Sequence, residues 1–377
     1  MKPKLNDALG RGRNNFDLVR LFAAILVMFG HSYMVQKTPG NWDPIQTFTG
    51  QELCSSLAVY AFFLVSGIFI TRSFDQNPRP ARFLLARSLR IWPGLVACAV
   101  VTAFVIGPLM SSDTLTGYFS NPTTYTWPLT VAGVFFGTPP FLPGLFEHNH
   151  TPFVNIALWT LPIEIKCYAL VLLLGTFGML STKRKAIISI VVCAISFFYM
   201  IRHPPAETSF FYDVFMLQGS YNGYPVAFFL IGMTAYVFRD KIIIDGRMAL
   251  ALVISFVVLR HSHVATAIYY SAFTYGILWV GSTPVLRKLN QKHDYSYGVY
   301  IYGFFVQQCV QTLLPSITNY QSLLIAIPAA LVLAALSWHL VESPCLALLR
   351  RNKAAPISPD VTTSSLSSVR QQSASKP

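Results

Sequence analysis

The chain of 377 residues is unusually apolar, with 53% hydrophobic residues and only 11% charged residues. An average soluble domain has about 25% charged residues, so this composition excludes a soluble fold of this size, and the apolar content excludes a disordered chain. The formal net charge is +13. In a soluble protein this charge would suggest a nucleic-acid partner, but membrane proteins concentrate lysine and arginine in cytoplasmic loops. We therefore expect an integral membrane protein whose partner is the lipid bilayer and that binds no nucleic acid.

Apolar runs of about 17–25 residues, long enough to cross a bilayer, predict the secondary structure. Ten such runs centre, in chain order, on residues 16–35, 56–72, 90–110, 157–180, 184–201, 224–238, 247–260, 264–282, 297–314 and 322–341. The first run lacks a small-residue cleavage site, so we expect a retained helix and not a signal peptide. The runs predict an all-α fold, a polytopic membrane bundle of about ten transmembrane helices.

The positive charges predict the orientation of this bundle. With the N-terminus placed inside, 23 of the 28 lysines and arginines fall in inner segments. The outer segments hold only Lys37, Arg202 and Arg260, while Arg20 and Lys166 fall inside predicted spans. Such asymmetry predicts that both termini are cytoplasmic and that the number of spans is even.

Three segments are expected along the chain. They are a cytoplasmic N-terminal segment over residues 1–15, a membrane domain over 16–350, and a disordered cytoplasmic tail over 351–377, which is rich in Ser, Thr and Pro. Within the aromatic outer segment 110–156, residues 127–137 are expected to dip into the membrane or to lie on its outer face. The six cysteines are scattered, so we expect neither disulfides nor a metal site.

Two ionisable residues share one face of the first predicted span. Arg20 and His31 are eleven residues apart, which brings the second side chain back to within about 20° of the first and about 16 Å further along the axis. An ionisable group at membrane depth costs roughly 2.5–3.5 kcal/mol by insertion scales, so each is a functional candidate. The structural alternatives are an interfacial anchor for Arg20 and an interhelical hydrogen bond for His31. The shared face favours function.

The fourth span carries a second candidate group. Glu164 is expected not far from the level of His31, where a carboxylate would orient the imidazole or raise its basicity. The alternative is a structural ion pair with Lys166 or with another helix. Tyr168 follows four residues later on the same helix face and can donate a hydrogen bond to Glu164.

A pair of arginines opens the third span at its inner end. Arg87 and Arg90 are three residues apart, so both guanidinium groups can clamp one phosphate-bearing ligand. A simple topology signal is the alternative explanation for them. Glu342, near His339 at the inner end of the last span, is expected to pair with these arginines.

With these residues laid out, the chain resembles the acyltransferase-3 family of integral membrane O-acyltransferases. Residues 15–24 with His31-Ser32 are similar to the family's Arg-x10-His first helix. Five further blocks resemble family signatures in the expected order, at residues 62–67, 87–93, 158–168, 295–302 and 341–344. The resemblance covers about residues 12–350. Many family members carry a histidine where this chain has Gly303, so that histidine has no role here.

The resemblance implies a transferase of surface glycans, with residues 16–350 as the acyltransferase domain of a bacterial inner membrane protein. It implies acetyl-coenzyme A or another acyl-coenzyme A as the donor substrate, no permanently bound cofactor, and a carbohydrate or glycolipid acceptor. The donor's phosphates would dock near Arg87 and Arg90, with its arm running along the stripe from Arg20. His31 would act as general base, oriented by Glu164, or would itself be acylated first.

Two other classes of protein stay open from the sequence. A transporter or flippase for a polar or anionic solute would use Arg20, Glu164 and Lys166 to line its path. A membrane receptor or scaffold would leave His31 and Glu164 without a role. The sequence does not predict the acceptor, the acyl group or the oligomeric state.

Overall fold

A computed structural model describes residues 3–10, 12–38, 40, 42–134, 141–203, 223–289 and 292–351 of the chain. Within these ranges the regular elements are all helices, and the only β-pairing is two isolated bridges. The predicted all-α fold is therefore confirmed. The predicted disordered tail lies outside the described residues, apart from Arg351.

Each of the ten predicted runs coincides with a helix or a stack of helices. In chain order these are α2 (Phe16–Val35), α4 (Cys54–Gln76), α5 (Pro80–Val101) with η1 (Thr102–Ile106) and α6 (Gly107–Met110), η2 (Ile156–Thr160) with α9 (Leu161–Thr176), α10 (Lys183–Arg202), α12 (Gly223–Val237), α13 (Gly246–Leu259), α14 (Ala265–Ser282), α15 (Ser296–Leu313), and α16 (Asn319–Ser337) with η5 (Trp338–Glu342) and α17 (Ser343–Arg351). Five shorter elements complete the described fold, namely α1 (Leu5–Ala8), α3 (Pro44–Thr49), α7 (Leu115–Ser120), α8 (Pro122–Gly133) and η4 (Val285–Leu289). Six of the helices or stacks are long and apolar enough to cross a membrane, whereas α12 and α13 are shorter apolar helices. A helical membrane bundle is confirmed, and the number of spans stays a prediction.

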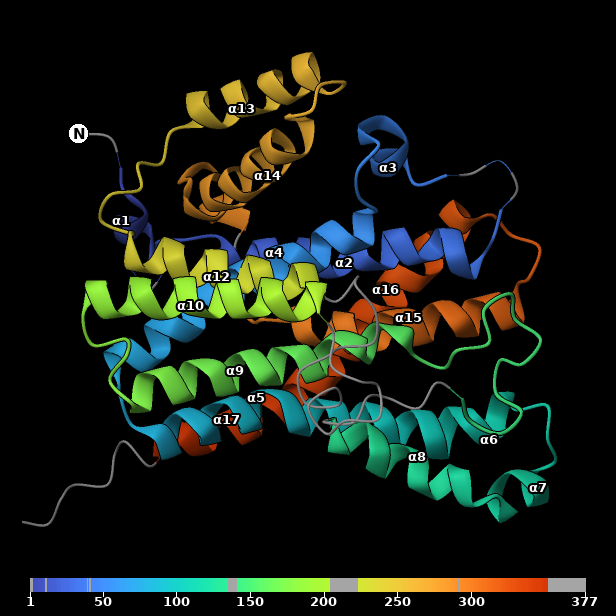
Figure 1. Ribbon diagram of the computed structural model, residues 1–377. Helices are drawn as coiled ribbons and strands as arrows, with labels where there is room; N and C mark the ends of the chain where they lie inside the picture. The colour runs from blue at the N-terminus through green and yellow to red at the C-terminus, as the bar shows by residue number, and fades with distance from the viewer. Residues whose placement is uncertain are drawn as a thin grey trace, which may run out of the picture.

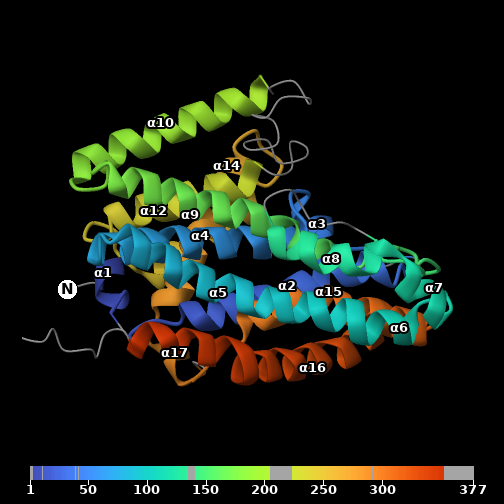
Figure 2. The same ribbon diagram turned by 90° about the horizontal axis from the view of Figure 1, so that it is seen from below.

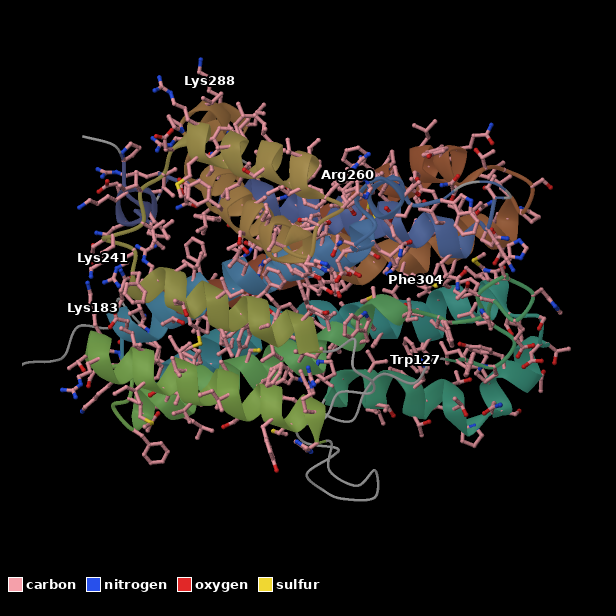
Figure 3. All side chains as sticks on the ribbon, turned by 45° about the horizontal axis from the view of Figure 1, so that its top comes forward. Trp127, Lys183, Lys241, Arg260, Lys288 and Phe304 are labelled. Carbon is pink, nitrogen blue, oxygen red and sulfur yellow. The ribbon has the colours of Figure 1, made fainter. Side chains whose placement is uncertain are left out.

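The long helices run roughly side by side (Figure 1). Figure 2 shows α10 at one edge of the bundle and α16 and α17 at the other, with α2, α4 and α15 between them. Lys183 and Lys241 lie at the same end of the bundle (Figure 3). We call this end, which carries the turns at residues 77–79, 177–182 and 238–245, the basic end. It is the end that the charge pattern predicts to be cytoplasmic.

Glycines allow the central helices to approach closely. An added Cβ at Gly67 of α4 would lie 2.1 Å from the carbonyl oxygen of Phe229, and one at Gly232 of α12 would lie 2.2 Å from that of Leu64. Helices in membranes use such small residues to pack backbone against backbone. Gly303 of α15 makes room for a side chain of α2, because an added Cβ would lie 2.7 Å from Cγ of Met28.

The short helix α8 packs along α5 in the half of the bundle away from the basic end. It begins at Pro122, and the side chain of the preceding Asn121 accepts a hydrogen bond from the backbone N–H of Thr123. At its other end, Trp92 Nε1 donates to the carbonyl oxygen of Ala132 at 3.0 Å. Trp92 lies twelve residues into α5, about 18 Å along its axis. The end of α8 thus lies beside the middle of α5, and the position of residues 127–134 relative to the membrane stays a prediction. Residues 135–137 of that prediction lie outside the described ranges.

Candidate active site

A pocket enclosing about 730 Å³ of empty space, part of it open to solvent, lies among α2, α4, α5, α9 and α15. Four of the five predicted site residues line it, namely Arg20, Arg87, Arg90 and Glu164. We call it the arginine pocket. His31 is not among its lining residues. The structure therefore brings together four predicted residues from three helices and leaves the fifth outside.

Arg20 is only weakly paired within the protein, so its positive charge can act on a ligand in the pocket. Its Nη1 lies 3.9 Å from Oδ1 of Asp17, whose side chain is 52% exposed. An ion pair this long and this exposed is weak. The guanidinium also lies 5.7 Å from the centre of the Phe69 ring of α4. Because α2 is one continuous helix from Phe16 to Val35, Arg20 and His31 share a face, as the spacing predicts.

Arg87 is the least satisfied cation of the pocket. Its guanidinium carbon lies 5.9 Å from the ring centre of Phe83 and 5.8 Å from that of Tyr168. Its Nε atom is enclosed and has no hydrogen-bond partner within the described ranges. A guanidinium presents five N–H donors in a planar fork that suits phosphate and carboxylate. The unfilled donor on Arg87 points to an anionic ligand in this pocket.

Arg90 differs from Arg87 because two carboxylates hold it. Its Nη2 lies 2.5 Å from Oδ2 of Asp294, and its Nη1 lies 3.7 Å from Oε2 of Glu342. The rings of Tyr297 and Trp338 lie 5.7 and 5.8 Å from its guanidinium carbon. The predicted pairing with Glu342 is confirmed. The two arginines do line one pocket, but the clamp is unequal because Arg90 is paired with two carboxylates, whereas Nε of Arg87 has no partner among the described residues.

Asp294 is a site residue that the sequence reasoning missed. It precedes α15, where its Oδ1 accepts hydrogen bonds from the backbone N–H and the hydroxyl of Ser296, at 3.1 and 2.5 Å. Burial alone would raise its pKa, but the charges of Arg90 and Arg20, with the Ser296 hydrogen bonds, hold the pKa below its ordinary value. In the sequence, Asp294 resembles an ordinary residue at a helix start, and only its position facing Arg90 reveals its second role.

Glu164 stands on the first turn of α9, two residues after Pro162. Proline fits the first turn of a helix because the N–H that it lacks would have no partner there. Tyr168 donates its hydroxyl hydrogen to Oε1 of Glu164, as their spacing predicts. The pair therefore places a carboxylate on the α9 wall of the arginine pocket, with Tyr168 fixing its position.

His31 lies beyond the end of the pocket that is farther from the basic end. The edge of its ring meets Phe304 of α15, with ring centres 5.2 Å apart. Tyr300, which lines the pocket, precedes Phe304 by four residues, so His31 lies about one helical turn, or 6 Å, past the pocket. Its Nδ1 is enclosed without a hydrogen-bond partner among the described residues. No hydrogen bond joins His31 to Glu164 in that part of the chain, so the orienting role of Glu164 stays a prediction.

An aromatic layer separates the pocket from His31. The Tyr300 hydroxyl lies 2.5 Å from Oγ1 of Thr160 and donates to the carbonyl oxygen of Ala157 at 2.6 Å. Phe62 of α4 meets the same ring edge-on, with centres 5.6 Å apart. A ligand that joins the arginine pocket to His31 has to pass this layer. Within the described ranges no group of three or more His, Cys, Asp or Glu side chains could hold a metal ion.

The chain is similar to known proteins over most of its length. A family model described as "Acyltransferase domain" matches residues 13–341. A protein named "O-acetyl transferase" from Shigella phage Sf6 is 29% identical over 354 residues, which cover 87% of this chain and 95% of the phage protein. "Nodulation protein 10" from Rhizobium leguminosarum bv. viciae is 28% identical over 368 residues, which cover 89% of this chain and 94% of that protein. No solved structure matches the chain.

Proposed function

The chain belongs to the acyltransferase family whose model spans residues 13–341, and from that premise we propose that it transfers an acetyl group from acetyl-coenzyme A to a hydroxyl of a glycan. That it is an integral membrane O-acyltransferase follows from the family, the phage relative and the apolar helices. The donor, the acyl group and the acceptor are the proposal. Family membership favours this enzyme over the transporter and the scaffold. The observation that carries the proposal is the unfilled donor of Arg87 in a pocket that ends about one helical turn from His31.

The charges of the pocket support a coenzyme A donor. Coenzyme A has a phosphate-rich head and a long, narrow arm that ends in the thioester. Arg20 and Arg87 carry the positive charge that such phosphates require, and Nε of Arg87 is a donor without a partner among the described residues. Along α2, the axial distance from Arg20 to His31 is about 16 Å. The head would therefore stay in the arginine pocket while the arm passes Tyr300 and Phe62 and brings the thioester to His31.

His31 is the proposed general base. An unprotonated imidazole nitrogen takes the proton of the acceptor hydroxyl, and the oxygen attacks the carbonyl carbon of the thioester. The carbon–sulfur bond breaks, and the leaving thiolate takes the proton from the imidazolium. In the two-step variant the imidazole attacks the thioester and expels the coenzyme A thiolate, which takes up the imidazole proton. The acceptor hydroxyl then attacks the acyl-imidazole, and its proton passes to the imidazole as the carbon–nitrogen bond breaks. Glu164 would act on His31 through an intervening substrate or water group, because the two side chains share no direct hydrogen bond within the described residues.

The relatives support the acyl group and the setting of the reaction. The phage protein is named an O-acetyl transferase, which favours acetyl over longer acyl groups. The family resemblance favours a surface glycan as the acceptor and a bacterial inner membrane as the location. The basic end favours delivery of the donor from the cytoplasm, because lysine and arginine gather on that side of membrane proteins.

The test is turnover of labelled donor by the purified protein in detergent micelles. With acetyl-coenzyme A carrying a ¹⁴C-acetyl group, we expect the wild-type protein to release free coenzyme A. His31→Ala, compared at equal abundance of folded protein, should not release it. His203→Ala is the matched control, since His203 is exposed at the end of α10. If the wild-type protein, supplied with a glycan acceptor, neither releases coenzyme A nor takes up or transfers label, the proposed reaction is wrong.

A further inference from the structure

The face of α15 that lines the arginine pocket continues past His31 as a stripe of side chains. Tyr297, Tyr300, Phe304, Gln307 and Gln311 follow one another at spacings of three and four residues, which keeps them on one helix face. The first two line the pocket, and Phe304 meets His31. The last two are glutamines that lie further from the basic end.

Both glutamines are buried with an unused acceptor. Gln307 is 0% exposed and Gln311 is 3% exposed. The side-chain carbonyl oxygen Oε1 of each is enclosed and has no hydrogen-bond partner in the part of the chain that the structure describes. Neighbouring Gln308 shows the contrast, because its Oε1 accepts from Asn149 Nδ2 at 3.0 Å and its Nε2 donates to the carbonyl oxygen of Phe153 at 2.6 Å.

Gln307 is hydrogen-bonded to α2 three residues before His31. Its Nε2 donates to the carbonyl oxygen of Met28 at 2.8 Å. A helical carbonyl points toward the C-terminal end of its helix, so the oxygen of Met28 lies under the side chains three and four residues on. The first of these is His31. The unpartnered atoms Nδ1 of His31 and Oε1 of Gln307 and Gln311 therefore belong to one seam between α2 and α15, which we call the glutamine seam.

The chemistry of the glutamine seam selects a ligand class. Buried polar groups without partners are rare in native proteins, and three along one seam point to a ligand that completes them. An amide oxygen only accepts hydrogen bonds, so its partner must bring O–H or N–H donors. A phosphate or carboxylate brings acceptors and negative charge, and finds no cation among the three side chains. A neutral compound with several hydroxyl groups fits these acceptors.

We propose that Gln307 and Gln311 form the acceptor subsite of the enzyme, where they accept hydrogen bonds from hydroxyl groups of a neutral carbohydrate and hold a further hydroxyl at His31. This inference rests on the proposed function, since it gives the residues that bind the acceptor of that reaction. Gln311 is the residue to change, because Gln307 also anchors α15 to α2 through the Met28 carbonyl.

The experiment measures acceptor use and donor use separately in the same full-length protein. Membranes containing the protein receive ¹⁴C-acetyl-coenzyme A and the surface polysaccharide of the encoding cells, stripped of acetyl groups by mild alkali. Gln311→Met keeps the side-chain volume and removes the acceptor oxygen. Gln46→Met, at an exposed position of α3, is the matched control.

For Gln311→Met we expect the apparent KM for the polysaccharide to rise at least tenfold. Release of coenzyme A without polysaccharide and the KM for acetyl-coenzyme A should stay within twofold of wild type. An unchanged KM for the polysaccharide would overturn the subsite and leave the proposed function standing. A parallel fall in donor and acceptor use would also overturn it, because Gln311 would then be structural. Wild-type protein that releases coenzyme A but leaves the polysaccharide unlabelled would refute a carbohydrate acceptor.

Discussion

The arginine pocket and the glutamine seam lie about two helical turns apart along α15, from Tyr300 to Gln307, and they differ in the kind of polar group they carry. The pocket holds three arginines and a carboxylate, and part of it is open to solvent. The seam holds an imidazole and two amides, all without a formal charge when His31 is neutral. Charge attracts an anionic donor over a distance, whereas amides discriminate only by direct hydrogen bonds. A transferase whose two substrates differ in charge can keep them apart by this division.

The largest expected effect is that of removing the group that joins the two regions. His31→Ala should lower acyl transfer by about 10²–10⁴-fold, the usual contribution of a general base. Affinity for acetyl-coenzyme A should stay within threefold, because the charged head binds at the other region. Steady-state kinetics and equilibrium binding measure the two quantities. Donor affinity that falls together with the rate would show that the two regions are not separate.

Arg90→Ala should act on folding more than on donor binding. It leaves the carboxylates of Asp294 and Glu342, which are 18% and 2% exposed, without their shared cation. Breaking a buried ion pair from one side costs roughly 3–5 kcal/mol. We expect a lower melting temperature in detergent and a smaller yield of folded protein. A stable Arg90→Ala variant with weak donor binding would instead make Arg90 a direct ligand of the donor.

Arg87→Ala should act in the opposite way. A hydrogen bond to a charged group contributes about 1.5–3 kcal/mol, so the Kd for coenzyme A should rise roughly 10- to 100-fold. The melting temperature should change little, because Nε of Arg87 has no partner among the described residues to lose. Arg79→Ala, at an exposed position of the basic end, should leave the Kd unchanged. Unchanged coenzyme A affinity in Arg87→Ala would remove the pocket from the donor-binding role.

The smallest effect is a pH dependence of stability that involves Asp294. Its folded pKa is held below its unfolded value of about 3.9, so its ion pair stabilises the fold above that pH and is lost as the pH falls through the folded pKa. Asp294→Asn should therefore lower the melting temperature most near pH 7. The difference from wild type should shrink below about pH 4. A difference that grows on acidification would mean that Asp294 is protonated in the folded protein.

The helix period allows contacts within a single helix to be predicted from the sequence. The shared face of Arg20 and His31 and the contact from Tyr168 to Glu164 follow from the helix period, and both are present. Partner choice across the bundle does not follow from that period. Asp294 meets Arg90 across 204 positions of sequence, and nothing local marks it as the partner. The sequence likewise does not show that Tyr300 closes the pocket before His31, since this depends on how four helices pack.

Gln307 and Gln311 show a second limit of the sequence. Three buried glutamines occur within five residues of α15. The sequence alone does not distinguish Gln308, whose side-chain oxygen and nitrogen both form hydrogen bonds, from the other two. The distinction comes from the surrounding chain, because residues 149–153 reach Gln308 and no described residue reaches Oε1 of its neighbours.

The contact between Gly67 and Gly232 has a consequence for how the enzyme moves during turnover. The backbones of α4 and α12 fit so closely there that a shift by one residue would push a side chain into a carbonyl group. The two helices are therefore expected to move as one rigid body. If the arm of the proposed donor passes Tyr300, we expect the opening that admits it to come from α2, α5, α9 or α15 moving against this pair. A covalent tether between α4 and α12 should leave turnover intact, whereas one between α4 and α9 should stop it.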